Sequence, residues 1–263
     1  MFSKYIILFV IYSFMGFIWE SFFCIFQYKG WSRRGFLYGP VCPIYGVGAL
    51  VITFLIRYVP FLDVNNPNYN LRVFLVASIG SFILEWCTAT FLEKVFNAAW
   101  WDYSMFPLNI QGKVCLFCTL GFGVGGIIIP KYVIPVIENY VDMIPNILYE
   151  PIAYVLIIIM SVDFALTISA LTDFQEKVKF IDTSFNSRME NVVEGAKSKG
   201  ISAKDKLKEE KEKYIDENIK RIMVTKDYLY NGAIGRINQF KFKDRDNEHK
   251  NLIAKKIKTF LRK

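Results

Sequence analysis

Long apolar stretches constrain this chain more than any other feature of its sequence. A helix needs about 20 mostly apolar residues to cross a bilayer. Five stretches of the 263-residue chain approach or reach that length, and each holds at most one acidic residue. They lie at residues 5–26, 43–59, 72–92, 114–129 and 152–171. The sequence therefore predicts an all-α, polytopic membrane protein with about five spans.

Charge divides the chain into two parts. Through Thr172 the sequence holds nine basic and nine acidic residues, so the net charge of +8 lies entirely in the remainder. We expect a transmembrane domain over residues 1–172 and a basic tail over residues 173–263. The tail has no proline between Asp173 and Tyr230 and is predicted to be helical.

The tail pattern predicts several helices. Breaks are expected at residues 198–200 and near Gly232 and Gly235, before an amphipathic helix at residues 252–261. Such a tail is typical of a solvated or self-associating arm, and binding to anionic lipid is the main alternative. No nucleic-acid partner is expected, because acidic residues are interspersed among the basic ones.

Lysine and arginine near the span ends predict the topology. The loop after the first span holds Lys29, Arg33 and Arg34, whereas the loop after the fourth span is mainly acidic. Cytosolic loops of membrane proteins carry an excess of Lys and Arg. We therefore expect an external N-terminus and a cytosolic C-terminus in the cell membrane.

A weak internal repeat relates spans one and two to spans three and four. In each half a small residue precedes a glutamate by four positions, and a tryptophan-bearing loop then leads to Gly-x-x-Cys at the next helix start. The glutamates are Glu20 and Glu85. On the predicted topology the two spans that carry these glutamates cross the membrane in the same direction, which makes the halves parallel repeats. In transporters built from repeats, the substrate site lies between the halves.

Three acids lie inside predicted spans, where an ionisable group is costly and is a candidate functional residue. Glu20 and Glu85 are candidates for binding a substrate or an ion. The alternative is a structural ion pair, for example of Glu20 with Arg33 or Arg34. Asp163, near the middle of the fifth span, suggests proton or cation coupling, or else a protonated side chain bonded to a neighbouring helix.

The two loops that precede spans two and four supply further candidates. Basic residues and glycine turns at helix starts could bind a phosphate or carboxylate, because helix starts expose free N–H groups. Anchoring by the positive-inside rule and an aromatic belt is the alternative. The candidates are Trp31, Arg33, Arg34, Gly35, Tyr38, Gly39, Pro40, Pro43, Tyr45, Gly46, Trp100, Trp101, Asp102, Tyr103, Asn109, Gly112 and Lys113.

These loops carry a family resemblance. The segment from Trp31 to Gly46, WSRRGFLYGPVCPIYG, resembles the signature of the bacterial membrane proteins called the putative ABC-transporter type IV family. WWDYS at residues 100–104, followed by PLNIQGKVCL at residues 107–116, is similar to that family too. The resemblance covers about residues 10 to 175 and implies a permease-like membrane protein.

The function expected is that of a permease-like component of an ABC-type transporter. The sequence has no Gly-x-x-x-x-Gly-Lys-Ser/Thr phosphate loop, so a separate ATPase subunit is expected. Five spans are few for a pathway, which favours a homo-oligomer in membrane lipid. The alternative is a non-transporting protein that binds lipid or a partner through its loops and tail.

No enzyme activity, metal or cofactor is expected, because no set of nucleophile and base or of metal ligands can be assembled. Cys115-x-x-Cys118 could be a metal or redox pair, although packing is the simpler interpretation.

Overall fold

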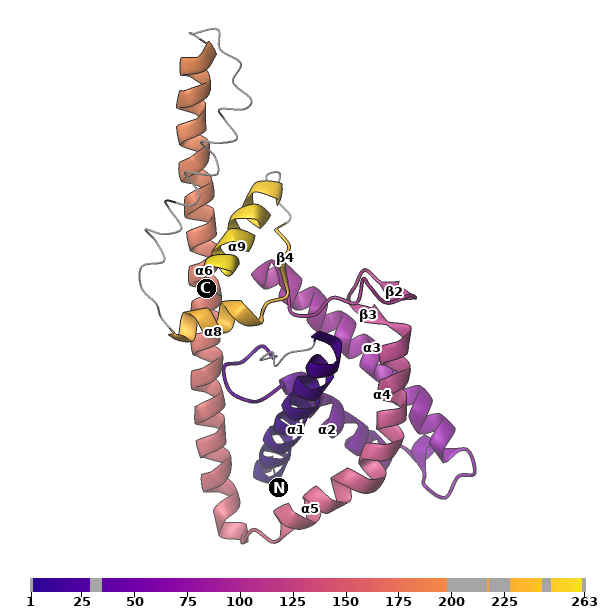
Figure 1. Cartoon of the computed structure of the whole chain (residues 1–263). Coiled ribbons are helices and arrows are strands. Elements are labelled where there is room, and N and C mark those ends of the chain that lie inside the picture. The colour runs from indigo at the N-terminus through magenta and orange to yellow at the C-terminus, as the bar shows by residue number, and fades with distance from the viewer. Residues whose placement is uncertain (1, 29–34, 198–216, 218–227, 243–246, 262–263) are drawn as a thin grey trace. The chain divides into compact units, whose positions relative to one another are not determined.

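The computed structural model describes residues 2–28, 35–197, 217, 228–242 and 247–261 (Figure 1). The described residues are mainly helical with very little sheet, as predicted, and the chain divides into two compact units. The membrane unit comprises residues 1–92 and 100–165, and the C-terminal unit comprises residues 93–99 and 166–263. The boundary therefore differs from the single division expected after residue 172.

The membrane unit contains the helices and strands that carry the candidate residues. They are α1 (Phe2–Tyr28), α2 (Pro43–Tyr58), the short 3-10 helix η1 (Pro60–Leu62), α3 (Tyr69–Phe96), β2 (Asn109–Ile110), β3 (Val114–Cys115), α4 (Leu116–Ile128), the π-helical turn η2 (Ile129–Val133), α5 (Ile134–Asp142) and the first part of α6 (Asn146–Lys197). Helix α3 ends, and α6 continues, in the C-terminal unit.

Four of the described helices are long and apolar enough to cross a membrane. They cover Phe2–Phe22, Tyr69–Phe96, Leu116–Asp142 and Asn146–Ser184. Helix α2, the expected second span, has only 16 residues, because Pro43 fixes its first turn and the chain leaves the helix just before Pro60. The expected fourth span is longer than predicted, since the helix continues past Ile129 through a π-helical turn that holds Pro130.

Helices α1 and α3 run in the same direction, and α2 and α4 run in the opposite direction. A cluster near one end joins the last turns of α2 to Val73, early in α3, and to Ile127, late in α4. A second cluster joins Ile7 and Leu8, early in α1, to α5 at the end of α4. Two parallel helical hairpins follow from these contacts, as the internal repeat predicts.

The same kind of packing contact occurs inside each hairpin. The Ser13 hydroxyl of α1 lies against Gly46 of α2, and the Ser78 hydroxyl of α3 lies against Gly123 of α4. At neither glycine is there room for a Cβ atom, so the helices approach closely. Each serine precedes its hairpin's glutamate by seven residues. Gly46 follows Cys42 by four residues and Gly123 follows Cys115 by eight, so the second hairpin has one more helical turn before the contact.

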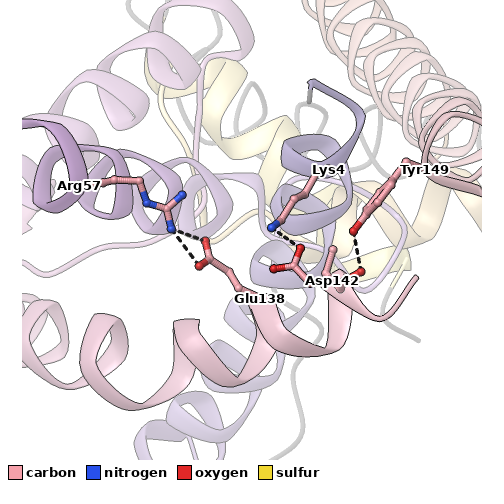
Figure 2. Close-up of polar contacts among 6 residues, drawn as sticks. Lys4, Arg57, Glu138, Asp142 and Tyr149 are labelled. Atoms are coloured by element: carbon pink, nitrogen blue, oxygen red, sulfur yellow. Dashed lines mark hydrogen bonds and ion pairs between the residues drawn. The ribbon is translucent and has the colours of Figure 1, made fainter. Parts of the chain in front are cut away.

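Helix α5 makes charged contacts with α1 and α2. It leaves α4 at an angle and leads to α6 (Figure 1). Arg57 at the end of α2 donates to both carboxylate oxygens of Glu138, and Lys4 pairs with Asp142 (Figure 2). The Tyr149 hydroxyl donates to the Val141 carbonyl oxygen over 2.8 Å. Glu138 and Asp142, two acids of the expected fourth loop, are thus part of a helix and are paired.

The C-terminal unit has a core of its own. The remaining elements are β1 (Ala98–Ala99), α8 (Tyr228–Arg236), β4 (Gln239–Phe240) and α9 (Asn247–Leu261). The fully buried side chains of Phe174, Val178 and Ile181 lie along α6, with the helical spacing expected from the sequence. Ile234 and Ile237 and, from α9, Ile253, Ala254 and Ile257 are also buried. A packed domain replaces the solvated arm expected for this part of the chain.

The helix boundaries of the tail differ in part from those expected. Helix α6 runs without interruption to Lys197, so the predicted fifth span and the start of the tail form one helix. Gly232 and Gly235 lie inside α8 and do not break it, because burial of Ala233 and Ile234 outweighs the helix cost of glycine, about 1 kcal/mol each. The break expected at residues 198–200 lies outside the described residues.

Candidate functional site

The first loop is held by an internal carboxylate. The backbone N–H groups of Tyr38 and Gly39 donate to Oδ1 and Oδ2 of Asp163, each over 2.7 Å. A Cβ atom at Gly39 would lie 2.8 Å from Asp163 Oδ2, so only glycine allows the carboxylate this close. Tyr38 and Gly39 were candidates for an anion site, but their amides are occupied by a side chain of the protein itself.

Asp163 therefore has a structural partner. Its carboxylate reaches from α6 to a loop more than 120 residues earlier, and it accepts charge-assisted hydrogen bonds there. Of the two alternatives left by the sequence, this resembles the structural one, although the partner is a loop backbone and not a helix. Trp31, Arg33 and Arg34 lie outside the described residues.

Gly35, Pro40 and Pro43 shape the rest of this loop. Gly35 has φ of +107°, a conformation that disfavours other residues, and a Cβ atom there would lie 3.1 Å from Cys42 Sγ. The Cys42 N–H donates to the Ser13 carbonyl oxygen over 2.9 Å, which fixes the start of α2 against α1. Pro40 is exposed, and Pro43 begins α2.

The second loop contains a short β-hairpin. Strands β2 and β3 pair antiparallel, and Gly112, with φ of +67°, lies in the turn between them. The Asp102 carboxylate accepts the Ser104 N–H over 2.9 Å and fills the space beside Gly112. Asn109 accepts the Gly112 N–H and donates to the Phe106 carbonyl oxygen. Asp102, Asn109 and Gly112 thus build the loop itself.

The tryptophans and Lys113 of this loop also have internal partners. Trp101 Nε1 donates to the Lys113 carbonyl oxygen over 2.8 Å, and the Trp100 ring lies 5.4 Å from that of Phe36 in the first loop. Lys113 is only 7% exposed; its ammonium donates to Thr90 over 3.1 Å and lies 5.1 Å from the Trp86 ring centre. Lys113 points to α3 and is not presented to an external anion.

The two glutamates each receive a tyrosine hydroxyl. Tyr45, at the start of α2, donates to Glu20 Oε2 over 2.7 Å. Tyr103, in the second loop, donates to Glu85 Oε1 over 3.1 Å. Glu85 is 6% exposed, and its Oε2 has no hydrogen-bond partner among the described residues. Glu20 is half-buried.

The Tyr103 hydroxyl is buried beside acidic residues. Burial above all, and then the charge of Glu85 and the smaller effect of Glu20, raise the pKa of the Tyr103 hydroxyl far above its ordinary value. Tyr103 therefore remains protonated and can donate. Tyr45 and Phe122 immediately precede Gly46 and Gly123 in the two hairpins. Their rings lie 6.1 Å apart, which brings the two hairpins into contact beside the tyrosine bonded to Glu20.

This arrangement is suited to binding a cation or a proton. The two carboxylates, from equivalent positions in the repeats, each receive a tyrosine hydroxyl, and Glu85 Oε2 has no hydrogen-bond partner among the described residues. No group of three or more His, Cys, Asp or Glu side chains is placed to hold a metal ion in the part of the chain that the structure describes. Cys115 caps α4 by accepting the Cys118 N–H at its Sγ, over 3.3 Å, which gives it a structural role.

Phe122 and the glycines Gly123 and Gly126 are residues that sequence reasoning missed. The pattern Gly-x-Gly-x-x-Gly at residues 121–126 is visible in the sequence, but it does not say which glycine faces a neighbouring helix. In the structure Gly123 and Gly126 face α3, whereas Gly121 has no atom within 4 Å of a Cβ position.

The model of one family, described as putative ABC-transporter type IV, matches residues 7–168. The chain belongs to this family. No curated protein and no solved structure matches the chain. The family match includes both hairpins, both loops and the part of α6 that carries Asp163. It ends at residue 168, close to residue 166, where α6 enters the C-terminal unit. The candidate acids of this putative ABC-transporter type IV chain all lie within the matched region.

Proposed function

We propose that the chain is the membrane-embedded, permease-like component of an ABC-type transporter and that its solute site lies at Glu20 and Glu85. The observation that supports this most is that the acid at the equivalent position of each repeat receives a tyrosine hydroxyl, Tyr45 on Glu20 and Tyr103 on Glu85, while the rings of Tyr45 and Phe122, one from each hairpin, lie 6.1 Å apart. Repeat-built transporters place their substrate between the repeats. Within these 263 residues no phosphate loop occurs, so we propose that a separate ATPase subunit hydrolyses ATP.

The solute class we propose is cationic, a proton or a small cation. A carboxylate in apolar surroundings favours a positive partner, because an unpaired charge there costs several kcal/mol, on the order of 3 or more. An anionic solute is less favoured by the geometry. The Tyr38 and Gly39 amides are bonded to Asp163, and Lys113 is buried against α3.

The test is a charge-displacement measurement on proteoliposomes adsorbed to a solid-supported membrane. Rapid addition of small cations should give a transient current that Glu20→Gln and Glu85→Gln each reduce about tenfold or more. Glu150→Gln, at an exposed acid of α6, is the matched control and should leave the current unchanged. A current that responds only to anions, or that survives both substitutions, would contradict the proposal.

The second candidate is a non-transporting membrane protein that binds lipid or a partner. The folded core of the C-terminal unit favours it, because a packed domain offers a defined surface to a partner. Native mass spectrometry of the purified protein distinguishes the two, since it reports a copurified ATPase, retained lipid and a second copy of the chain in one spectrum.

A further inference from the structure

The end of α3 and the start of the second loop belong to the C-terminal unit. Asn97, with φ of +49°, ends α3, and Ala98 and Ala99 form strand β1. Strand β1 pairs antiparallel with β4, with Ala98 opposite Phe240 and Ala99 opposite Gln239. A segment of the chain near its C-terminus therefore holds three residues that lead directly into the loop beginning at Trp100.

This attachment is built from several contacts. The Asn238 N–H donates to the Ala99 carbonyl oxygen over 2.8 Å, and the Lys241 N–H donates to the Asn97 carbonyl oxygen over 2.6 Å. The Lys241 ammonium pairs with Glu93 over 2.7 Å, where the Glu93 side chain is only 5% exposed. Removing one partner of a buried ion pair strongly destabilises the surrounding fold, because the other charge is left without compensation. We call these contacts, made by residues 238–241 on residues 93–99, the β1 clasp.

Within the membrane unit, the loop continues to the Tyr103 hydroxyl. Trp100 follows Ala99 and is buried, and the Tyr103 N–H donates to the Gly112 carbonyl oxygen over 2.8 Å. Tyr103 is thus fixed against the β2–β3 turn, in the loop that begins where the β1 clasp ends. Glu20 differs from Glu85 in this respect. The hydroxyl group that donates to Glu20 belongs to Tyr45 in helix α2 and not to a loop residue.

We propose that the C-terminal unit controls the protonation of the Glu85 carboxyl group but not that of Glu20. The reason is that the β1 clasp holds the start of the loop that places the Tyr103 hydroxyl on Glu85. Tyr103 is a positioning residue for Glu85, and a partner that binds the C-terminal unit acts on the site through this loop. The significance of this control rests on the proposed function, but the control itself is measured on the carboxyl groups. A chain that transports nothing could still show it.

The test is labelling of the full-length protein in detergent with a hydrophobic carbodiimide, quantified at Glu20 and Glu85 by peptide mass spectrometry. The reagent modifies protonated buried carboxyl groups, and a donated hydrogen bond favours the ionised form. Tyr103→Phe should raise labelling at Glu85 about tenfold and leave Glu20 unchanged. Tyr45→Phe is the mirror control and should raise labelling at Glu20 alone.

The decisive variant is Lys241→Met, which removes the ion pair of the β1 clasp. It should reproduce the Tyr103→Phe result at Glu85, and the double variant should label no more than Tyr103→Phe alone, because both changes act on one contact. Lys255→Met, at an exposed lysine of α9, is the matched control and should change nothing.

Two results would overturn the inference. One is unchanged Glu85 labelling in Lys241→Met while Tyr103→Phe raises it, since the loop would then not depend on the clasp. The other is an equal rise at Glu20 and Glu85, which would mean general loosening. If Lys241→Met does not fold, Glu93→Gln breaks the same ion pair with a side chain of similar shape, and the same two results decide.

Discussion

At the residue scale, the glycines that pack the two helices of each hairpin together make a measurable prediction. A Cβ atom at Gly46 would lie 2.8 Å from the Phe9 carbonyl oxygen, a backbone atom that cannot move aside. Gly46→Ala should therefore lower the free energy of unfolding by about 1–3 kcal/mol. Gly121→Ala is the control, because nothing lies within 4 Å of its Cβ position, and its helix should gain up to about 1 kcal/mol. Thermal unfolding in detergent measures both, and equal effects would contradict the packing described.

Asp163 makes a second prediction at this scale. Asp163→Asn can accept a hydrogen bond at only one side-chain oxygen, so one of the two loop amides loses its partner. The first loop should loosen, and buried Cys42 should react faster with a maleimide in a variant that keeps only that cysteine. Unchanged reactivity of Cys42 would show that the carboxylate does not hold the loop.

Single residues also show how far the sequence determines the site. Glu20 and Glu85 are identifiable from sequence, because an acid in an apolar stretch is costly and needs a reason. The partners of Asp163 and Lys113 cannot be identified from the sequence. Asp163 bonds to a loop backbone and Lys113 contacts the Trp86 ring, and both contacts depend on how the helices pack. The role of Asp102 and Asn109 in the loop likewise follows from a turn geometry that glycine and asparagine permit but do not specify.

At the scale of elements, α5 tests how much surface ion pairs contribute. Arg57 is 45% exposed and Glu138 is 16% exposed, which makes their pair partly screened by solvent. Glu138→Gln should cost no more than about 1 kcal/mol of stability. A double-mutant cycle with Arg57→Met in thermal unfolding should give a coupling energy of that size. A coupling of several kcal/mol would show that α5 depends on the pair far more than its exposure suggests.

Elements differ in how well the sequence predicts them. The long apolar helices follow from hydropathy, and the proline and glycine positions around α2 mark its start and end. Strands β1 and β4 have two residues each, and they pair across about 140 positions, so no local pattern defines them. Helix α5 was expected to be a loop because acidic residues interrupt its apolar pattern, yet Ile134 and Val141 are buried against α1 and keep it helical.

At the scale of the whole molecule, the topology is a direct prediction. A reporter fused after Lys263 should read as cytosolic, and one inserted at residues 143–145, between α5 and α6, should read as external. The positive-inside rule sets this orientation. A cytosolic signal from the α5–α6 connection would contradict the predicted orientation, although the parallel arrangement of the hairpins would stand.

The central claim is that Glu20 and Glu85 form one site between two parallel repeats. The measurement that tests it most directly is the cation-induced current of proteoliposomes holding Glu20→Gln, Glu85→Gln or both. Groups that act as a unit are not additive, so each single variant should lose as much current as the double variant, at equal membrane abundance. Losses that add, together with lower membrane abundance, would show two separate structural acids and would contradict the account.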